Sequence, residues 1–307
     1  AIARHIGQLL PIEDWETFGQ EIPLLVNCMP AGKFLGEGFY RAGGLPAVIG
    51  ELIQAGKLRD EALTVSGKTI RENYVGITSN DSNVIRSFDK PLKENAGFMV
   101  LSGNIFDNAL IKVSVISEDF QRRYLSTPGD ENAWEGRAIV FEGPEDHRAR
   151  IDDPELEIDE DCILFIRGCG PIGFPGSAET VSMHPPTRLA NLGCHGLPCA
   201  GDGRQSGTSA SPSILNICPE AAIGGGLAIL QTGDRVRVDL NKRSVNMLVS
   251  DEELQKRRAT LQLPELKHQT PWQEIYRDTV GQLDTGACIE SAVKYQKIRE
   301  TIPRHAH

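Results

Sequence analysis

The sequence has no run of apolar residues that approaches the roughly 18 needed to span a bilayer. It also has no leader in which basic residues precede an apolar segment. Hydrophobic residues make up 40% of the 307 residues and charged residues 24%, which is typical of globular proteins. These features predict a soluble, cytoplasmic protein without a membrane partner.

The sequence also lacks an excess of positive charge. It contains 32 lysines and arginines against 42 aspartates and glutamates, so its formal net charge is -10. Phosphate groups would be repelled by this balance. Nucleic acid is therefore not an expected partner.

The cysteines do not form a recognisable framework. There are seven, an odd number, and no secretory context, so we expect reduced thiols instead of disulfides. The pairs Cys162/Cys169 and Cys194/Cys199 have histidines nearby, but their spacing differs from the two to four residues usual between zinc ligands. A zinc site is thus the weaker interpretation, and burial as small core residues is favoured.

Two different hydrophobic periodicities divide the chain. Apolar residues recur every three or four positions over residues 45–55 until Gly56, which predicts a helix. Alternation over 111–115 and 235–240 predicts strands with one buried face, and the apolar run 162–166 predicts a strand buried on both faces. We expect an α/β (α+β) protein in which the end of an α/β domain precedes a β-barrel-like domain flanked by helices.

The domain boundaries follow from composition. Residues 1–75 are assigned to the C-terminal part of an α/β domain, the polar residues 76–100 to a linker, and 101–307 to the barrel-like domain with a helical tail. Ser250 with Glu253 has the spacing of a capping box, which predicts a helix after the last strand. A second helix is expected over residues 285–299.

Residues 201–209, with the sequence GDGRQSGTS, are the strongest candidate for a functional loop. Three glycines would let the backbone approach a ligand closely, and the loop also offers Ser206 and Thr208 as hydroxyl groups. The loop is neither a Walker loop nor a dinucleotide-binding fingerprint. Read from the residues alone, it is either an anion-binding or proton-transfer site or an ordinary glycine-rich turn.

A second glycine-rich run, residues 168–176, leads to Glu179. A carboxylate in this position would suit a hard cation such as Mg²⁺. The simpler alternative is an acidic residue near a helix N-terminus, where the macrodipole favours it. One carboxylate by itself does not define a metal site.

Several short blocks occur in an order that resembles the dihydroxyacid and 6-phosphogluconate dehydratase family, and the resemblance covers most of the chain. The blocks are PAGK (30–33), RAGGLPA (41–47), LTVSGKT (63–69), GN (103–104), PGSAE (175–179), DGRQSG (202–207), CPEAA (218–222) and VSDEE (249–253). Gln205 and the segment SPSILN (211–216) are similar to the branch that acts on sugar acids. Dihydroxyacid dehydratase, in which phenylalanine replaces this glutamine, is the alternative.

The resemblance implies loss of water from an aldonate, such as L-arabinonate or D-xylonate, to give a 2-keto-3-deoxy acid. A [2Fe-2S] cluster and Mg²⁺ would be the cofactors. Matched by motif, Ser206 would be the catalytic base, Thr208 a polar neighbour in the same pocket, and Glu179 a ligand of Mg²⁺. Asp202 and Arg204 would shape the loop.

The family's cluster cysteines and most of its magnesium ligands belong to an N-terminal half that this sequence does not contain. We therefore expect these 307 residues to be a portion of a longer chain and to be inactive alone. The family also implies a homodimer or homotetramer, in which the terminal His305 and His307 could reach a neighbouring pocket. A noncatalytic barrel module and a purely structural glycine-rich domain are the competing interpretations.

Overall fold

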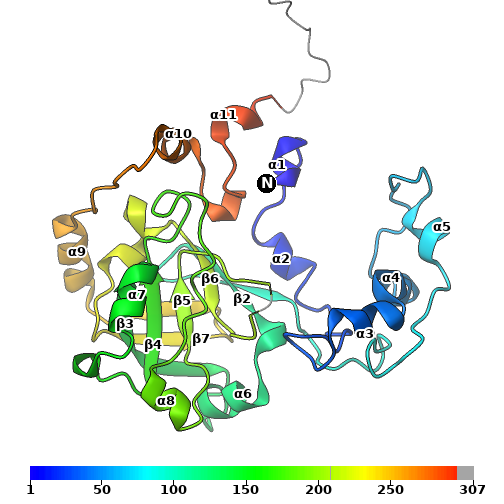
Figure 1. The fold of residues 1–307 in the computed structure, drawn as a ribbon, viewed down its shortest axis with the longest axis horizontal. Coiled ribbons are helices and arrows are strands. Elements are labelled where there is room, and N and C mark those ends of the chain that lie inside the picture. The colour runs from blue at the N-terminus through cyan, green and yellow to red at the C-terminus, as the bar shows by residue number, and fades with distance from the viewer. Residues whose placement is uncertain (208, 296–307) are drawn as a thin grey trace, which may run out of the picture.

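The centre of the molecule is one eight-stranded sheet, seen in Figure 1 with strand order β1-β2-β6-β5-β4-β3-β7-β8. The computed structural model describes residues 1–207 and 209–295. The strands are β1 (Phe98–Leu101), β2 (Asn108–Lys112), β3 (Ala133–Glu142), β4 (Cys162–Arg167), β5 (Cys199–Gly201), β6 (Ile214–Cys218), β7 (Arg235–Asp239) and β8 (Ser244–Met247). The four central strands run parallel, and two antiparallel strands flank them on each side.

The two edges of the sheet meet, so that it closes almost completely into a barrel. Directly after β1, the amide of Ser102 donates to the carbonyl of Arg243 at 3.0 Å, and the amide of Val245 in β8 donates back to Ser102 at 2.8 Å. These bonds satisfy edge groups that would otherwise be unpaired. The expected α/β chain with a barrel-like domain flanked by helices is thereby confirmed.

Side chains of the central strands point alternately to two separate hydrophobic clusters. Ile163 and Phe165 of β4 belong to the larger cluster, inside the barrel, to which all eight strands contribute. Leu164 and Ile166, on the opposite face of β4, belong to a second cluster outside the barrel. Every residue from 162 to 166 is at most 1% exposed. The prediction of a strand buried on both faces is confirmed, because helices and loops cover the outer face.

Eleven short α-helices are formed by the described residues. They are α1 (Ile2–His5), α2 (Asp14–Thr17), α3 (Gly36–Arg41), α4 (Gly44–Gln54), α5 (Ile70–Tyr74), α6 (Glu118–Tyr124), α7 (Pro144–Arg150), α8 (Thr187–Asn191), α9 (Asp251–Thr260), α10 (Pro271–Thr279) and α11 (Glu290–Val293). The helix α7 packs on β3, and Leu189 of α8 belongs to the outer cluster. None of the helices in 1–207 and 209–295 has the length and apolar composition required to cross a bilayer.

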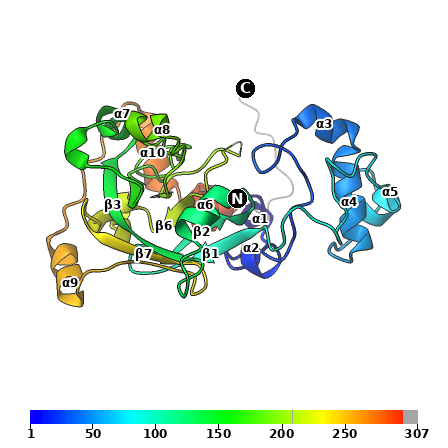
Figure 2. The same ribbon diagram turned by 90° about the horizontal axis from the view of Figure 1, so that it is seen from below.

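The helices α3, α4 and α5 stand apart from the barrel, as Figures 1 and 2 show. The helix predicted over residues 45–55 is α4, and Gly56, with φ of +67°, follows its C-cap. The buried core of this region is small and comprises Ala42, Ala47, Val84 and Ile85. The division of the chain at residues 76–100 stays a prediction.

The strand predicted over residues 111–115 is shorter than expected. The strand expected over 111–115 ends at Lys112, and Val113–Val115 forms a 3-10 helix. Lys93 caps this turn, since its ammonium group donates to the carbonyls of Val113 at 2.8 Å and Ile116 at 3.1 Å. The alternation of apolar and polar residues over 111–115 could not reveal the contact with Lys93, which lies about twenty residues earlier in the chain.

The helix expected over 285–299 is limited, within the described residues, to α11. Gly286 and Ala287 have positive φ values of 92° and 47°, which interrupt a helix, and Val280 forms a β-bridge with Ile289. Residues 296–299 lie outside the described part of the chain. The predicted helix after the last strand is confirmed as α9, where the hydroxyl of Ser250 accepts from the Glu253 amide at 3.2 Å.

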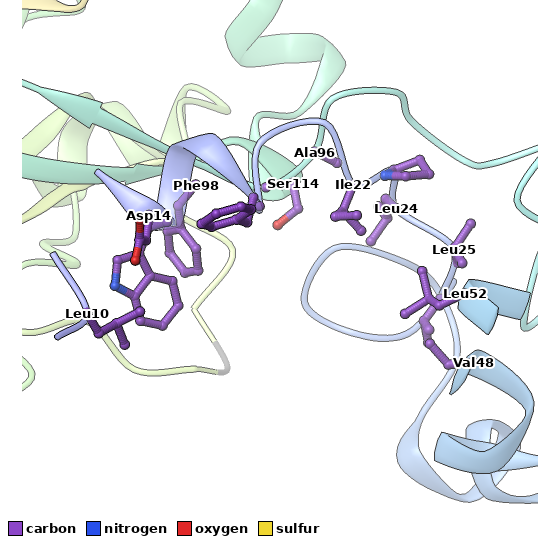
Figure 3. Close-up of a pocket in the computed structure, with 16 residues that line it drawn as sticks. Leu10, Asp14, Ile22, Leu24, Leu25, Val48, Leu52, Ala96, Phe98 and Ser114 are labelled. Carbon is purple, nitrogen blue, oxygen red and sulfur yellow. The ribbon is translucent and has the colours of Figure 1, made fainter. Parts of the chain in front are cut away.

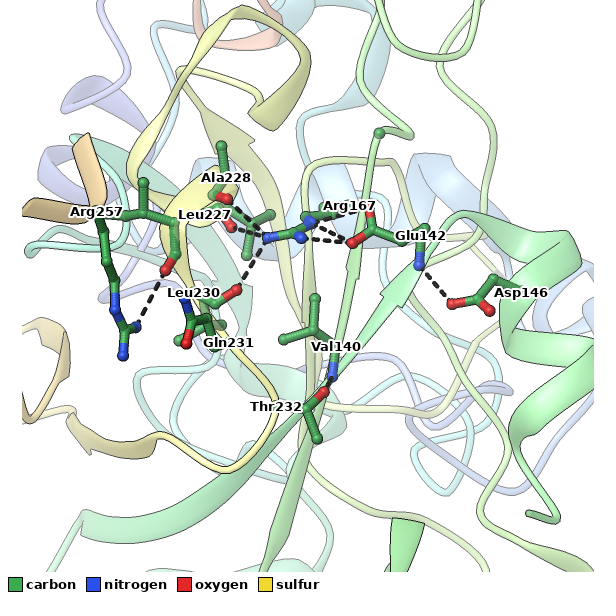
Figure 4. Close-up of polar contacts among 12 residues, drawn as sticks. Val140, Glu142, Asp146, Arg167, Leu227, Ala228, Leu230, Gln231, Thr232 and Arg257 are labelled. Atoms are coloured by element: carbon green, nitrogen blue, oxygen red, sulfur yellow. Dashed lines mark hydrogen bonds and ion pairs between the residues drawn. The ribbon is translucent and has the colours of Figure 1, made fainter. Parts of the chain in front are cut away.

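A partly buried arginine, Arg167, joins the barrel to a neighbouring turn, as Figure 4 shows. Arg167 donates from Nη1 to the carbonyls of Leu227, Ala228 and Leu230 at 2.9–3.1 Å, and its Nε donates to Glu142 at 2.9 Å. These carbonyls lie at the end of the 3-10 helix Gly226–Ile229, where the Leu227 carbonyl also accepts the amide of Leu230 at 3.4 Å. Arg167 therefore holds this turn against β4.

Replacing Arg167 by methionine is expected to lower the free energy of unfolding by about 2 kcal/mol, because three carbonyls lose their charged donor. Urea denaturation of the 307-residue chain measures this change. Arg122→Met is the matched control, since the Arg122 side chain is 72% exposed, and we expect an effect of less than about 0.5 kcal/mol there. Equal effects of the two substitutions would contradict the assigned role of Arg167.

Candidate active site

The two glycine-rich segments meet at one edge of the parallel part of the sheet. One follows β4 and the other follows β5, and these strands are parallel neighbours. The carboxyl ends of adjacent parallel strands lie at the same edge, where open α/β sheets commonly bind ligands. The topology thus brings together two loops that the sequence separates by more than twenty residues.

Backbone hydrogen bonds fix the register between these loops. The Arg204 amide donates to the carbonyl of Ala178 at 3.0 Å, and the Val181 amide donates to the carbonyl of Arg204 at 3.3 Å. Glu179 and Arg204 are therefore bridge partners. Ser206 follows only two residues after this bridge, so the glutamate and the serine belong to one small region.

Asp202 anchors the loop that carries Ser206, residues 202–207 and 209–213, which we call the serine loop. Its carboxylate is completely buried and accepts N–H groups from Gly168 at 3.0 Å, Cys169 at 2.8 Å and Ala221 at 2.9 Å. Burial raises the pKa of Asp202 to about 6, although the three backbone N–H groups act in the opposite direction. The predicted role of Asp202 in shaping the loop has a clear physical basis in these contacts.

Arg204 provides a second link, from the serine loop to the segment before Glu179. Its Nε donates to the carbonyl of Ser177 at 2.7 Å. Ser177 is buried with φ of 52°, and its hydroxyl donates to the carbonyl of Cys169 at 3.2 Å. A strained residue of this kind persists only where its surroundings hold it. Arg204 therefore helps to fix the position of Glu179.

Gln205 folds the rest of the loop back on itself. Its Nε2 donates to the Ser211 carbonyl at 2.6 Å and lies 3.2 Å and 3.3 Å from the hydroxyls of Ser209 and Ser213. This geometry needs an amide donor, which phenylalanine at the same position would not supply. Ser206, half-buried, is thus carried by a loop held on both sides.

Two of the loop's three glycines serve protein packing. A Cβ atom on Gly201 would lie 2.6 Å from the Ile166 side chain, and one on Gly203 would lie 2.9 Å from the Ala178 carbonyl. The expectation that all three allow close approach of a ligand is therefore wrong for these two. Gly207 differs, because a Cβ atom there would meet nothing within 4 Å.

Glu179 does not begin a helix, so the helix-macrodipole explanation for this residue is wrong. It lies in an irregular segment between the glycine-rich run and Val181, and its side chain is exposed. Because the carboxylate of Glu179 is exposed beside the serine loop, it is available to a cation. Its assignment as a magnesium ligand, and that of Ser206 as the base, stay predictions. Thr208, His305 and His307 lie outside the described residues.

The residues present offer one predicted magnesium ligand, Glu179, and none of the clustered thiols that an iron–sulfur cluster needs. Mg²⁺ requires near-octahedral oxygen coordination, and residues 1–207 and 209–295 contain no group of three His, Cys, Asp or Glu side chains arranged to hold a metal. Burial raises the pKa of Cys169, Cys199 and Cys218 to about 12, which disfavours the thiolate form that a cluster ligand needs. This chain therefore does not fit a [2Fe-2S] cluster by itself.

Sequence reasoning did not identify the role of Glu220. This carboxylate is completely buried, accepts the amides of Ile172 at 3.0 Å and Gly173 at 2.8 Å, and receives the side-chain amide of Gln282 at 2.7 Å. It thereby holds the glycine-rich run in place. The block CPEAA contained the signal, since an acid within an otherwise apolar segment must be partnered if it is buried.

Comparison with protein families matches nearly the whole chain to two domains of one family. Residues 83–287 match the model of the dihydroxy-acid/6-phosphogluconate dehydratase C-terminal domain, and residues 1–73 match that of the N-terminal domain of the same family. The chain belongs to the dihydroxy-acid/6-phosphogluconate dehydratase family.

The curated relatives of the chain include dehydratases named for sugar acids and dehydratases named for dihydroxy acids. The chain is 54% identical over its full length to D-xylonate dehydratase of Caulobacter vibrioides, and 36% identical over 94% of its length to L-arabinonate dehydratase of Rhizobium leguminosarum. It is 34% identical over 94% of its length to a dihydroxy-acid dehydratase of Caldanaerobacter subterraneus. The chain covers 51%, 48% and 49% of these three proteins, or about half of each.

Proposed function

We propose that this chain forms the C-terminal part of an aldonate dehydratase, a hydro-lyase that converts a sugar acid to its 2-keto-3-deoxy acid. The observation that carries the proposal is the register between Arg204 and the segment 178–181, which joins the serine loop to Glu179. The 54% identity to D-xylonate dehydratase supports a pentonate as substrate.

The reaction removes one water molecule from a 2,3-dihydroxy acid. Ser206 accepts the C2 proton, the C3 hydroxyl leaves, and the resulting enol tautomerises to the keto acid. An unassisted serine is too weak a base for this step and must have its pKa lowered by positive charge nearby. Asp202 and Arg204 hold the loop that presents Ser206, and Gln205 closes it.

The cofactors of the proposed enzyme are Mg²⁺ and a [2Fe-2S] cluster. Glu179 would be one magnesium ligand in this chain, and Mg²⁺ would stabilise negative charge on the substrate oxygens. The remaining ligands would come from the half of the protein that the relatives have and this sequence does not. We also propose that the enzyme is a cytoplasmic homodimer or homotetramer that binds a small sugar acid and neither nucleic acid nor membrane.

Dihydroxy-acid dehydratase is the second candidate, since members with this name are 33–34% identical to the chain. The contacts of Gln205 favour the sugar-acid branch. Its amide holds Ser209, Ser211 and Ser213 in a polar arrangement on the serine loop. Phenylalanine at position 205 could make none of these hydrogen bonds, so this polar arrangement requires the glutamine that resembles the sugar-acid branch.

The decisive experiment measures keto-acid formation by the purified longer protein with its cluster intact. The substrates are a panel of C5 and C6 aldonates together with 2,3-dihydroxyisovalerate. We expect turnover of a C5 aldonate and none by the 307-residue chain alone. Turnover of dihydroxyisovalerate only would reassign the protein to the second candidate, and no turnover at all would favour a noncatalytic binding module.

A further inference from the structure

Exposed apolar side chains are concentrated at the N-terminal end of the chain. Among the described residues, fourteen of the 22 large hydrophobic side chains that are exposed lie between residues 2 and 77, which is a quarter of the sequence. The same region contributes little to the buried core. Monomeric soluble proteins rarely expose contiguous apolar patches of more than a few hundred Å². This distribution marks a surface that is normally covered.

The centre of this surface is an apolar groove of about 610 Å³, shown in Figure 3. We call it the apolar groove, and its principal lining residues are Leu10, Trp15, Phe18, Ile22, Leu52 and Phe98. They come from α2, the segments on either side of it, α4 and β1, so the groove connects the N-terminal helices with the edge of the barrel. Asp14 and Ser114 are the polar side chains that also reach it.

The side chains of the groove are positioned but only partly covered. Trp15 packs edge-on against Phe98 of β1, with ring centroids 5.6 Å apart and an interplanar angle of 85°. Nevertheless, Trp15 is 45% exposed, Leu10 51% and Phe18 67%. Large aromatic side chains with this combination of order and exposure are typical of the centres of protein interfaces.

We propose that the apolar groove is the docking site for the rest of the N-terminal domain, namely the part of the relatives that this sequence does not cover. Residues 1–73, which contain most of the groove, match the N-terminal domain model, and the chain covers about half of each relative. The groove thus belongs to a domain of which a substantial part is absent. The occupant is an apolar element of that part, and its docking brings the missing half beside the barrel.

The first test compares Phe18→Glu in the 307-residue chain and in the longer protein. In the short chain the glutamate faces water, so we expect the midpoint of thermal unfolding to change by less than roughly 2 °C. In the longer protein it would be buried without a partner, and we expect the midpoint to fall by roughly 5 °C or more. Ile275→Glu is the matched control, because Ile275 is 53% exposed on α10, away from the groove.

The second test measures acrylamide quenching of Trp15 fluorescence, obtained as the difference between each protein and its Trp15→Phe variant. We expect quenching to fall at least about twofold in the longer protein, since the occupant shields the indole. Equal quenching in both proteins, or equal effects of Phe18→Glu in both, would overturn the proposal. So would a dimer of the short chain that Phe18→Glu dissociates while Trp15 stays accessible in the longer protein, because the occupant would then be a second copy.

Neither test measures catalysis. The proposal depends on membership of the dehydratase family and on the apolar groove, and not on the substrate. A longer protein that protects Trp15 but converts no aldonate would leave the docking site established and refute the proposed reaction. A longer protein that converts an aldonate but leaves Trp15 exposed would support the proposed reaction and refute the docking site.

Discussion

Replacing Ser206 by alanine is expected to reduce aldonate dehydration by the longer protein roughly 10²- to 10⁴-fold, the usual contribution of a positioned base. The hydroxyl would be lost as the acceptor of the C2 proton, whereas the contacts of Asp202, Arg204 and Gln205 that anchor the loop would remain. We therefore expect kcat to fall, with a change in thermal midpoint of less than roughly 2 °C.

The matched control is Ser211→Ala on the same loop. The hydroxyl of Ser211 lies 2.8 Å from that of Ser213, but Gln205 binds the backbone carbonyl of Ser211, which the substitution keeps. We expect the control to lose less than roughly tenfold in kcat. A Ser206→Ala enzyme that kept activity similar to the control would show that the base is another residue.

Replacing Asp202 by alanine is expected to lower the free energy of unfolding of the 307-residue chain by about 3 kcal/mol at pH 7. Three buried N–H groups, on Gly168, Cys169 and Ala221, would lose their acceptor, and each unsatisfied group costs about 1–3 kcal/mol. Relief of the buried charge would offset part of this loss. Urea denaturation measures the change, with the exposed Asp89 replaced by alanine as the control.

The effect of Asp202→Ala should depend on pH. Burial raises the pKa of Asp202 to about 6, above its usual value of 3.8, so the folded protein holds this proton more tightly than the unfolded chain. The contribution of Asp202 to stability is therefore largest below about pH 4 and declines as the pH rises to about 6. The stability difference between wild type and variant should narrow over this range and stay constant above it. A difference that widened with pH would show that the amide bonds outweigh burial.

The buried acids explain why the proposed site can be rigid although it is built from glycine-rich loops. Asp202 and Glu220 together bind five backbone amides, four in the glycine-rich run 168–176 and one at Ala221. The glycine-rich run follows β4 and Ala221 follows β6, so the backbone groups of both lie beyond the hydrogen bonds of the sheet. The site is therefore held by side chains that do not need to contact the substrate.

Residue types and their spacing were sufficient to predict the main elements and the family. The apolar run of β4, the helical period of α4 and the cap of α9 each depend on contacts between residues close in sequence, so local pattern specifies them. The ordered blocks, among them DGRQSG and PGSAE, likewise predicted the family to which the chain belongs.

Only the tertiary structure decided which distant residues act together. The strand pairing of β4 with β5 placed Glu179 beside Arg204. The end of an expected strand is a 3-10 turn, and the ammonium group of Lys93 donates to its carbonyls. Glycines that sequence reasoning assigned to ligand binding proved to accommodate Ile166 and Ala178. The physical reason is that loop contacts, close approaches and the burial of acids depend on residues far apart in the chain, whereas periodicity reports only which face of a local element is covered.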